Sequence, residues 1–224
     1  MDKKDFLESV KTLRTSSHKR NFNQSVDFII NLQDLDFKKP EHQIDFFVTL
    51  QNDIGRKRKI CALVGPELSE DAKKIFDKTI NQEEFDNYLN NNKDLKKISS
   101  EYDYFVAQAN IMAKIAQVFG RTLGPRNKMP NPKAGCVVPP KSNLKPLYEK
   151  LQKTIRVMAK KSPIIHLCIG KENQSDEILV DNMFIIYDQL VHHLPKEQHN
   201  IRSIYVKFTM GKAIKIYPKE LIKV

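Results

Sequence analysis

The chain has 224 residues, enough for two modest domains, and 40% of them are hydrophobic while 29% are charged. No run of about 18 apolar residues occurs, and the charged N-terminus lacks the apolar stretch of a signal peptide, so we expect a cytoplasmic protein with no membrane span. Three scattered cysteines exclude a disulfide framework and a cysteine zinc site.

The first part of the chain predicts one helix followed by strands. Apolar residues at helical spacing predict a helix over 5–13. Runs rich in β-branched and aromatic residues predict three strands, over 25–32, 44–50 and 59–64.

The pattern changes after Gly65-Pro66, where helix and strand signals alternate. We expect helices over 67–78 and 109–119 and a short buried strand over 101–107, with a polar, Asn-rich stretch over 85–95. This alternation is typical of a small α/β layer with partly parallel strands.

The last part of the chain has the same α+β pattern of helices and strands as the first part. Residues 144–157 read as helical and then extended, and 176–194 as a long amphipathic helix. Strands are expected over 163–170 and 201–208, with 213–217 pairing with the latter.

These patterns predict a two-domain fold. The first domain is α+β and built from both chain ends, residues 1–64 and 155–224. The second is an inserted α/β domain, three-layered and Rossmann-like, over residues 65–154.

The net charge of +11 is segregated along the chain. Residues 120–161 hold eleven Lys and Arg against one acid, and residues 196–224 hold seven against two, whereas 162–195 has one Lys against five acids. Such segregation favours a surface that binds a polyanion, with nucleic acid as the first candidate.

The densest basic stretch is "GRTLGPRNKMPNPKAG" at 120–135. Its three prolines prevent a helix from running through it, and it has too few apolar residues for a core strand. We interpret it as a rigid loop of the second domain whose basic side chains face a polyanion as a secondary contact: Arg121, Arg126, Lys128 and Lys133. The alternative is a structural loop with solvated charges.

The sequence carries no catalytic or metal-binding signature. There is no GxxxxGK[ST], no GxGxxG and no HExxH, and the six histidines lie near no cysteine pair. Cys136, beside the basic loop, is a candidate for a lowered pKa but has no partner for catalysis. We therefore predict no catalytic residue, no metal and no cofactor, and hence no enzyme.

Four motifs in order carry a resemblance to a known family. They are "RNFNQSVDFIINL" at 20–32, the loop at 120–135, "SDEILVDNM" at 175–183 and "IRSIYVKFTMGKAIKIYP" at 201–218. Together they resemble large-subunit ribosomal protein one, the mobile-stalk family, and the residues of these motifs are most similar to those of archaeal members.

The resemblance implies the same discontinuous architecture and a structural role on the large ribosomal subunit. It implies binding of large-subunit rRNA to form the stalk near the tRNA exit site, transient contact with exiting tRNA, and repression of translation of the protein's own mRNA. It also implies a monomer when free, located on cytoplasmic ribosomes.

The residues that match the family's RNA-facing positions all lie in the first domain: Arg20, Phe22, Ser203, Thr209, Met210, Gly211 and, more loosely, Lys160 and Lys161. Thr209 offers a hydroxyl to a ribose or phosphate, and Gly211 allows close backbone approach and positive φ. Each also has a bland alternative, because aromatic, Met and turn Gly residues are often simply structural. We expect turn replacements to weaken RNA binding more than Lys219→Ala.

Two other classes stay open at this point. One is a nucleic-acid-processing enzyme that uses the basic loop as a phosphate cradle. The other is a free-standing regulator that binds RNA or DNA outside the ribosome.

Overall fold

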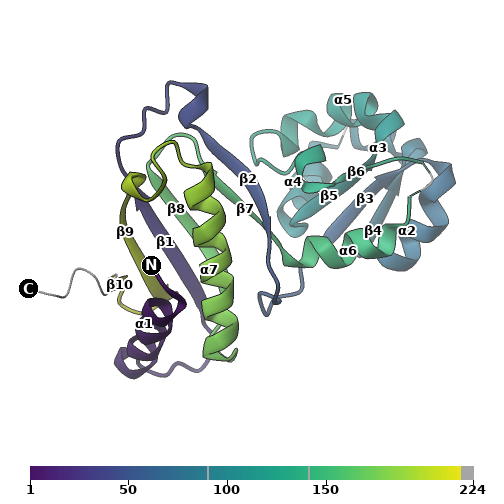
Figure 1. Ribbon diagram of the computed structural model, residues 1–224. Helices are drawn as coiled ribbons and strands as arrows, with labels where there is room; N and C mark the ends of the chain where they lie inside the picture. Colours follow the sequence, from purple (N-terminus) through teal and green to yellow (C-terminus); the bar gives the residue numbers. More distant parts are fainter. Residues whose placement is uncertain (90, 141, 218–224) are drawn as a thin grey trace, which may run out of the picture. The chain divides into compact units, whose positions relative to one another are not determined.

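The computed structural model describes residues 1–89, 91–140 and 142–217, which form two compact units (Figure 1). Unit 1 comprises Met1–Arg56 and Lys153–Val224, and unit 2 comprises Lys57–Gln152. The predicted fold class, an α+β unit from both chain ends with an inserted α/β unit, is therefore confirmed.

Unit 1 is built on an antiparallel four-stranded sheet in the order β10-β9-β1-β8. Its strands are β1 Ser25–Leu32, β8 Ile164–Lys171, β9 Ile201–Phe208 and β10 Ile214–Ile216. Along β1, every second residue from Val26 is buried. This alternation is expected for a sheet with one face on a core and the other toward solvent.

Helices α1 (Lys3–Ser16) and α7 (Asp176–His193) cover the buried face of this sheet (Figure 1). Phe6 of α1 meets Phe28 of β1 edge-to-face at a centroid distance of 6.2 Å. The helices thus leave the opposite face of the sheet open, and its outward-pointing residues are polar or partly exposed. The short 3₁₀ helices of this unit are η1 Pro40–His42 and η6 Glu197–Asn200.

A two-stranded antiparallel ribbon completes unit 1. It pairs β2 (Ile44–Thr49) with β7 (Thr154–Ala159). On its outer side the Asp45 carboxylate accepts two hydrogen bonds from the Arg156 guanidinium, at 2.7 and 2.8 Å. Lys160 Nζ reaches the same carboxylate at 2.7 Å.

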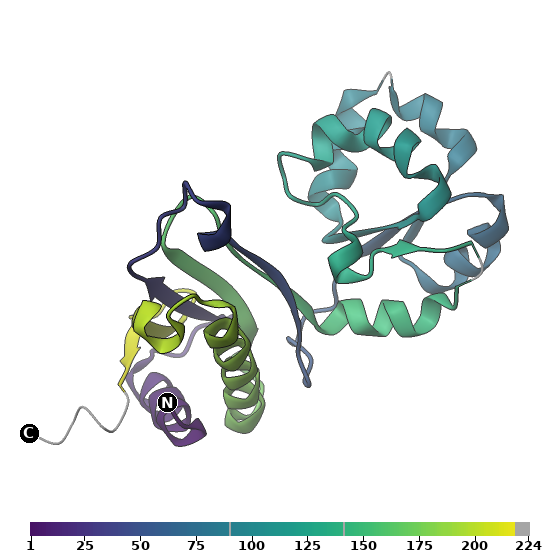
Figure 2. The same cartoon turned by 45° about the horizontal axis from the view of Figure 1, so that its top comes forward.

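Unit 2 is a parallel sheet in the order β4-β3-β5-β6 with helices on both faces (Figures 1 and 2). Its strands are β3 Ile60–Val64, β4 Lys78–Asn81, β5 Tyr104–Gln108 and β6 Val137–Val138. Its helices are α2 Ser69–Ile75, α3 Phe85–Leu89, α4 Asn92–Glu101, α5 Met112–Leu123 and α6 Leu144–Lys153. The 3₁₀ helices are η2 Pro66–Leu68, η3 Gln82–Glu84, η4 Ala109–Ile111 and η5 Pro132–Ala134.

The strand at Ile60–Val64 corrects the expected domain boundary. We placed 59–64 in the first domain, but β3 pairs with both β4 and β5 in the sheet of unit 2. All five of its residues are buried. A strand covered on both faces is typical of a parallel α/β sheet. The unbroken apolar run of this strand was therefore a sign that it belongs to the inserted α/β unit.

Three further elements of unit 2 differ from the sequence prediction. One helix was expected over 67–78, but α2 ends at Ile75 and strand β4 begins at Lys78. Helices α3 and α4 occupy much of the polar stretch 85–95. The Asn91 side chain accepts a hydrogen bond from the Asp94 backbone and caps α4. Asparagine favours such caps, so the Asn-rich segment is a helix start and not only a loop.

Candidate nucleic-acid interface

Two chain segments that carry predicted RNA-facing residues lie side by side in unit 1. The Thr209 backbone N donates to the Ser25 carbonyl at 3.0 Å, and the Met210 backbone N donates to Gln24 Oε1 at 3.2 Å. These bonds hold the turn 209–211, after β9, against the segment that leads into β1. The structure therefore brings the neighbourhoods of Phe22 and Met210 together, although they are about 190 positions apart in sequence.

The side chains of this pair of segments are of two kinds: exposed apolar groups, and an exposed hydroxyl that is hydrogen-bonded back to the protein. Phe22 is 55% exposed and Met210 is 62% exposed, which is unusual for large apolar residues. The Thr209 hydroxyl instead donates to the Ser25 carbonyl and accepts from the Ser25 backbone N, each at 3.2 Å. Its position in the turn is therefore fixed by β1, a use that the sequence did not indicate.

Gly211 does not use the conformational freedom that we expected of it. The glycines with positive φ among the described residues are Gly55 and Gly135, not Gly211. A Cβ placed on Gly211 would lie 3.4 Å from Phe208 Cβ, which is ordinary contact. The expectation of positive φ was wrong, and the absence of a side chain matters here for access from outside.

Cationic groups flank the same segments. Arg20 is exposed, and Lys171 Nζ donates to Ser25 Oγ at 2.9 Å. Lys207 lies opposite Asp27 of β1 on the open face of the sheet. Asp27 also approaches His166 Nε2 at 3.5 Å, so one carboxylate lies among these bases.

Ser203 lies at the other end of the open face. It pairs with Asn31, whose Nδ2 donates to Ser203 Oγ at 2.9 Å. Thr209 lies six positions further along the extended chain, a span of about 20 Å. Ser203 is thus not part of the turn cluster and can contact only a ligand that extends along the sheet.

Lys160 and Lys161 lie beyond β7, at the turn into β8. Asn31 and Ile164 are Cα partners across β1 and β8, so this turn is near the Ser203 end of the sheet. Lys160 is held by the Asp45 carboxylate, which offsets its charge, whereas Lys161 is exposed. Of the two, Lys161 is the better candidate for a phosphate contact.

The basic loop of unit 2 uses two of its four predicted cations internally. Lys128 Nζ donates to the carbonyls of Ser99 and Tyr102, at 2.9 and 2.7 Å. An Arg126 guanidinium nitrogen donates to the Ser99 and Ser100 hydroxyls at 2.8 and 2.7 Å and to the Lys96 carbonyl at 3.2 Å. Both cations thus satisfy the C-terminal turn of α4, where orphan carbonyls and the helix dipole favour positive charge.

The remaining loop cations, Arg121 and Lys133, are exposed. Arg121 lies on α5, which extends to Leu123, so the first four residues of the expected loop are helical. Gly124 is the C-cap of the helix and Pro125, which has no backbone N–H, follows it; a Cβ on Gly124 would come within 2.7 Å of the Gly120 carbonyl oxygen. Fewer than the four predicted cations of the loop are therefore available to bind a polyanion.

Cys136 does not have the lowered pKa that its basic surroundings suggested. Burial raises the pKa of its thiol to about 11 and that of Cys61 to about 12. Desolvation disfavours the thiolate and outweighs the opposing backbone hydrogen bond with Asn131 at Cys136 and the opposing charge of Lys78 at Cys61. Both thiols are core groups and not nucleophiles.

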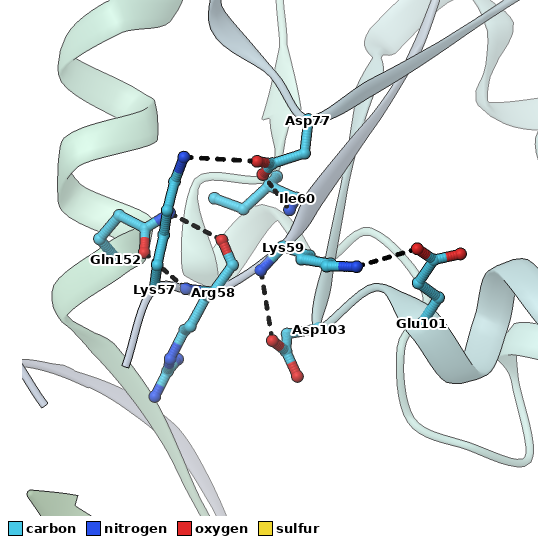
Figure 3. A network of polar contacts seen from close by, with 8 residues as sticks. All are labelled: Lys57, Arg58, Lys59, Ile60, Asp77, Glu101, Asp103 and Gln152. Carbon is cyan, nitrogen blue, oxygen red and sulfur yellow. Dashed lines mark hydrogen bonds and ion pairs between the residues drawn. The ribbon is translucent and has the colours of Figure 1, made fainter. Parts of the chain in front are cut away.

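The basic run Lys57-Arg58-Lys59 begins unit 2 and is tied into a polar network (Figure 3). Lys59 Nζ meets Glu101 at 2.9 Å, and this carboxylate raises the pKa of Lys59. The Arg58 backbone N donates to Gln152 Oε1 at 2.8 Å, and Gln152 Nε2 donates back to the Arg58 carbonyl at 2.9 Å. The second and last residues of unit 2 are thereby joined.

Searches for other kinds of site give negative findings for the described part of the chain. Over 1–89, 91–140 and 142–217, no group of three or more His, Cys, Asp or Glu side chains is arranged to hold a metal ion. Within the same ranges no helix is long and apolar enough to cross a membrane.

The fold and surface are typical of a protein that acts by binding: one unit has a sheet with exposed apolar and cationic groups, and the other is an inserted α/β unit. The chain belongs to the ribosomal protein L1p/L10e family, whose sequence model matches residues 13–212. The resemblance seen in the four motifs is thereby confirmed, and membership makes the chain a ribosomal protein rather than an enzyme.

Curated relatives match nearly the whole chain. The chain is 37% identical to "Large ribosomal subunit protein uL1" of Thermococcus kodakarensis over 216 residues, 96% of this chain and 98% of the relative. It is 36% identical to the protein of that name from Pyrococcus horikoshii, over 96% of each chain. With that from Methanobrevibacter smithii the identity is 38% over 95% of this chain and 98% of the relative.

Proposed function

We propose that this chain is a structural protein of the large ribosomal subunit that binds large-subunit rRNA through unit 1. The names of its relatives support the subunit, and the charge of +11 supports a polyanionic ligand. The contact surface comprises the segment with Arg20 and Phe22, the turn 209–211, and the open sheet face that leads to Ser203 and Lys161.

The observation that carries this proposal is the exposure of Phe22 and Met210 on segments that are hydrogen-bonded together. Single-stranded or splayed RNA is recognised by flat apolar groups that stack on bases and riboses, combined with cations for phosphates. Phe22 and Met210 supply the first kind of group, and Arg20, Lys171 and Lys207 supply the second. A folded surface that was merely solvated would not need two large apolar side chains here.

The finer role that we propose is the one that membership of the family suggests. The protein forms the mobile stalk near the tRNA exit site, with Arg121 and Lys133 of unit 2 as a secondary contact for passing tRNA. An RNA structure in its own mRNA that resembles the rRNA site would occupy the same segments, and translation of that mRNA would be repressed. The free protein is a monomer.

The test compares turn variants for binding to deproteinised archaeal large-subunit rRNA by filter retention. We expect Phe22→Ala, Met210→Ala and Gly211→Val each to weaken binding about tenfold or more, the scale of one lost aromatic or backbone contact of 1–3 kcal/mol. Lys219 lies outside the described residues, so the exposed Lys212 provides the basic comparison. Lys212→Ala should weaken binding less and reduce the salt slope by about 1.

Salt dependence and location provide the remaining checks. The logarithm of affinity should fall with the logarithm of salt concentration with a slope of about −3 or steeper, because several phosphates release counterions. All variants must melt near the parent temperature. Turn variants that stay folded and bind like the parent would overturn the assigned site, and failure to co-sediment with large subunits would favour a free-standing regulator.

A further inference from the structure

Gln24 is a polar residue that is 2% exposed at the point where the two segments of the interface meet. Its side-chain Oε1 accepts the hydrogen bond from the Met210 backbone N at 3.2 Å. Its own carbonyl accepts from the Glu172 backbone N at 2.9 Å, just after β8. One residue thus connects the start of β1, the end of β8 and the turn after β9.

The Met210 amide needs this partner because no strand supplies one. Strand β9 ends at Phe208, and β10 begins only at Ile214. The turn is otherwise held by the Thr209 bonds to Ser25 and by the Gly211 backbone N, which donates to the Phe208 carbonyl at 2.9 Å. Gln24 fixes the residue between them, whose side chain is the most exposed apolar group of the turn.

A buried amide is tolerated only where it is hydrogen-bonded, and the partner of this one is the backbone of a surface turn and not an element of the core. The glutamine instead sets the orientation of a surface residue. We propose that Gln24 is a positioning residue for RNA recognition, holding the Met210 backbone so that the side chain is presented to RNA. This inference rests on the proposed function of the turn.

The expected size follows from the population of the binding-competent turn. If loss of the Gln24 acceptor leaves the turn in the competent arrangement about one-tenth of the time, the apparent affinity falls about tenfold. Gln24 itself would touch no phosphate. The slope of affinity against salt should therefore stay unchanged, in contrast to the loss of a lysine contact.

The experiment uses the full chain with Gln24→Met, which keeps length and removes the acceptor. Gln24→Asn is a second variant, in which the shorter side chain withdraws its oxygen from Met210. Gln33→Met is the matched control, because Gln33 lies just past the other end of β1 and its Nε2 donates to the His199 carbonyl at 2.8 Å. Readouts are binding to deproteinised archaeal large-subunit rRNA at two salt concentrations, the melting temperature, and hydrogen exchange of the Met210 amide by NMR.

We expect both Gln24 variants to bind about tenfold more weakly with an unchanged salt slope, and Met210 amide exchange to accelerate while exchange within β1 and β9 stays slow. In a Met210→Ala background, Gln24→Met should cost little more, because the two changes act through one side chain. Gln33→Met should bind like the parent.

Three results would overturn the inference: unchanged affinity in the Gln24 variants, additive effects in the double variant, or faster exchange throughout β1 and β9 with a lowered melting temperature in both Gln24 variants. The last would make Gln24 a folding residue. If Met210→Ala alone has no effect, the proposed turn site itself is wrong. If Met210→Ala weakens binding and Gln24→Met does not, only the positioning role is wrong.

Discussion

At the scale of single residues, the neighbours Thr209 and Met210 differ in what their side chains contact. The Thr209 hydroxyl is engaged on both sides with the Ser25 backbone, while Met210 projects into solvent. Within the proposed RNA site, the part left to Thr209 is therefore mainly to fix the turn. The alternation of buried and open residues along 201–208 was readable from the sequence, but this hydroxyl was not, because its partner lies 184 positions away.

Replacement of Thr209 tests this division. Thr209→Val keeps the shape but leaves the Ser25 backbone groups without their side-chain partner, so we expect a loss of about 1–2 kcal/mol in the free energy of unfolding. Thr209→Ser should retain most of the stability, and Gly211→Ala should be nearly neutral because the added Cβ has room. Urea unfolding followed by circular dichroism measures all three. Equal stability of the Val and Ser variants would contradict the assignment.

At the scale of elements, the β2–β7 ribbon is fastened by one carboxylate. The hydrogen bond from Arg156 and that from Lys160 lower the pKa of Asp45 from 3.8 to about 2, against the opposing effect of burial. The folded-state pKa lies below the unfolded one. The pair therefore stabilises the protein above about pH 4, and this contribution is lost as the pH falls toward 2.

Asp45→Asn should lower the free energy of unfolding at pH 6 by about 1 kcal/mol, a figure reduced for solvent screening of this partly exposed pair. The difference from the parent should shrink between pH 4 and 2.5, because the parent loses the same interaction there. Urea titrations across this range measure it, with the exposed Glu41→Gln as control. A difference that does not change with pH would show that the ion pair is not its source.

Elements were predictable where the chain has a strong period or an unbroken apolar run. The strand over 25–32 and the helix beginning at Asp176 appear with their expected limits or nearly so. Strand β4 was missed because it is only four residues long and lies in the six residues between α2 and η3, too few to show a period. The hydrogen bonds from Lys128 to the end of α4 could not be predicted from the sequence either, because they depend on where α4 ends in space and not on the loop itself.

At the scale of the whole molecule, unit 1 should fold and bind RNA without unit 2. Lys153 remains bonded to unit 1, since its carbonyl accepts from the Leu50 backbone N and its Nζ donates to the Gln51 carbonyl, each at 3.0 Å. A flexible linker of about six residues spans up to about 20 Å, enough to rejoin Arg56 to Lys153. All residues of the proposed turn site lie outside the deleted part.

We expect the protein with residues 1–56 joined to 153–224 to show cooperative thermal unfolding and to keep rRNA affinity within about tenfold of the full chain. Circular dichroism and filter binding provide the two measurements. A matched comparison is the full-length Arg121→Ala, Lys133→Ala double variant, which removes only the exposed loop cations. Affinity a hundredfold weaker in a folded deletion protein would mean that unit 2 carries primary contacts.

The mutual hydrogen bonds between Arg58 and Gln152 have a mechanical meaning. The chain enters unit 2 next to the end of α6, where it leaves, so tension pulling the two ends apart loads this pair of bonds before the interior of the parallel sheet. The Lys57 and Lys59 ion pairs reinforce the same spot. A force on the two ends of unit 2 would thus be borne by this junction first, while the parallel sheet keeps its shape.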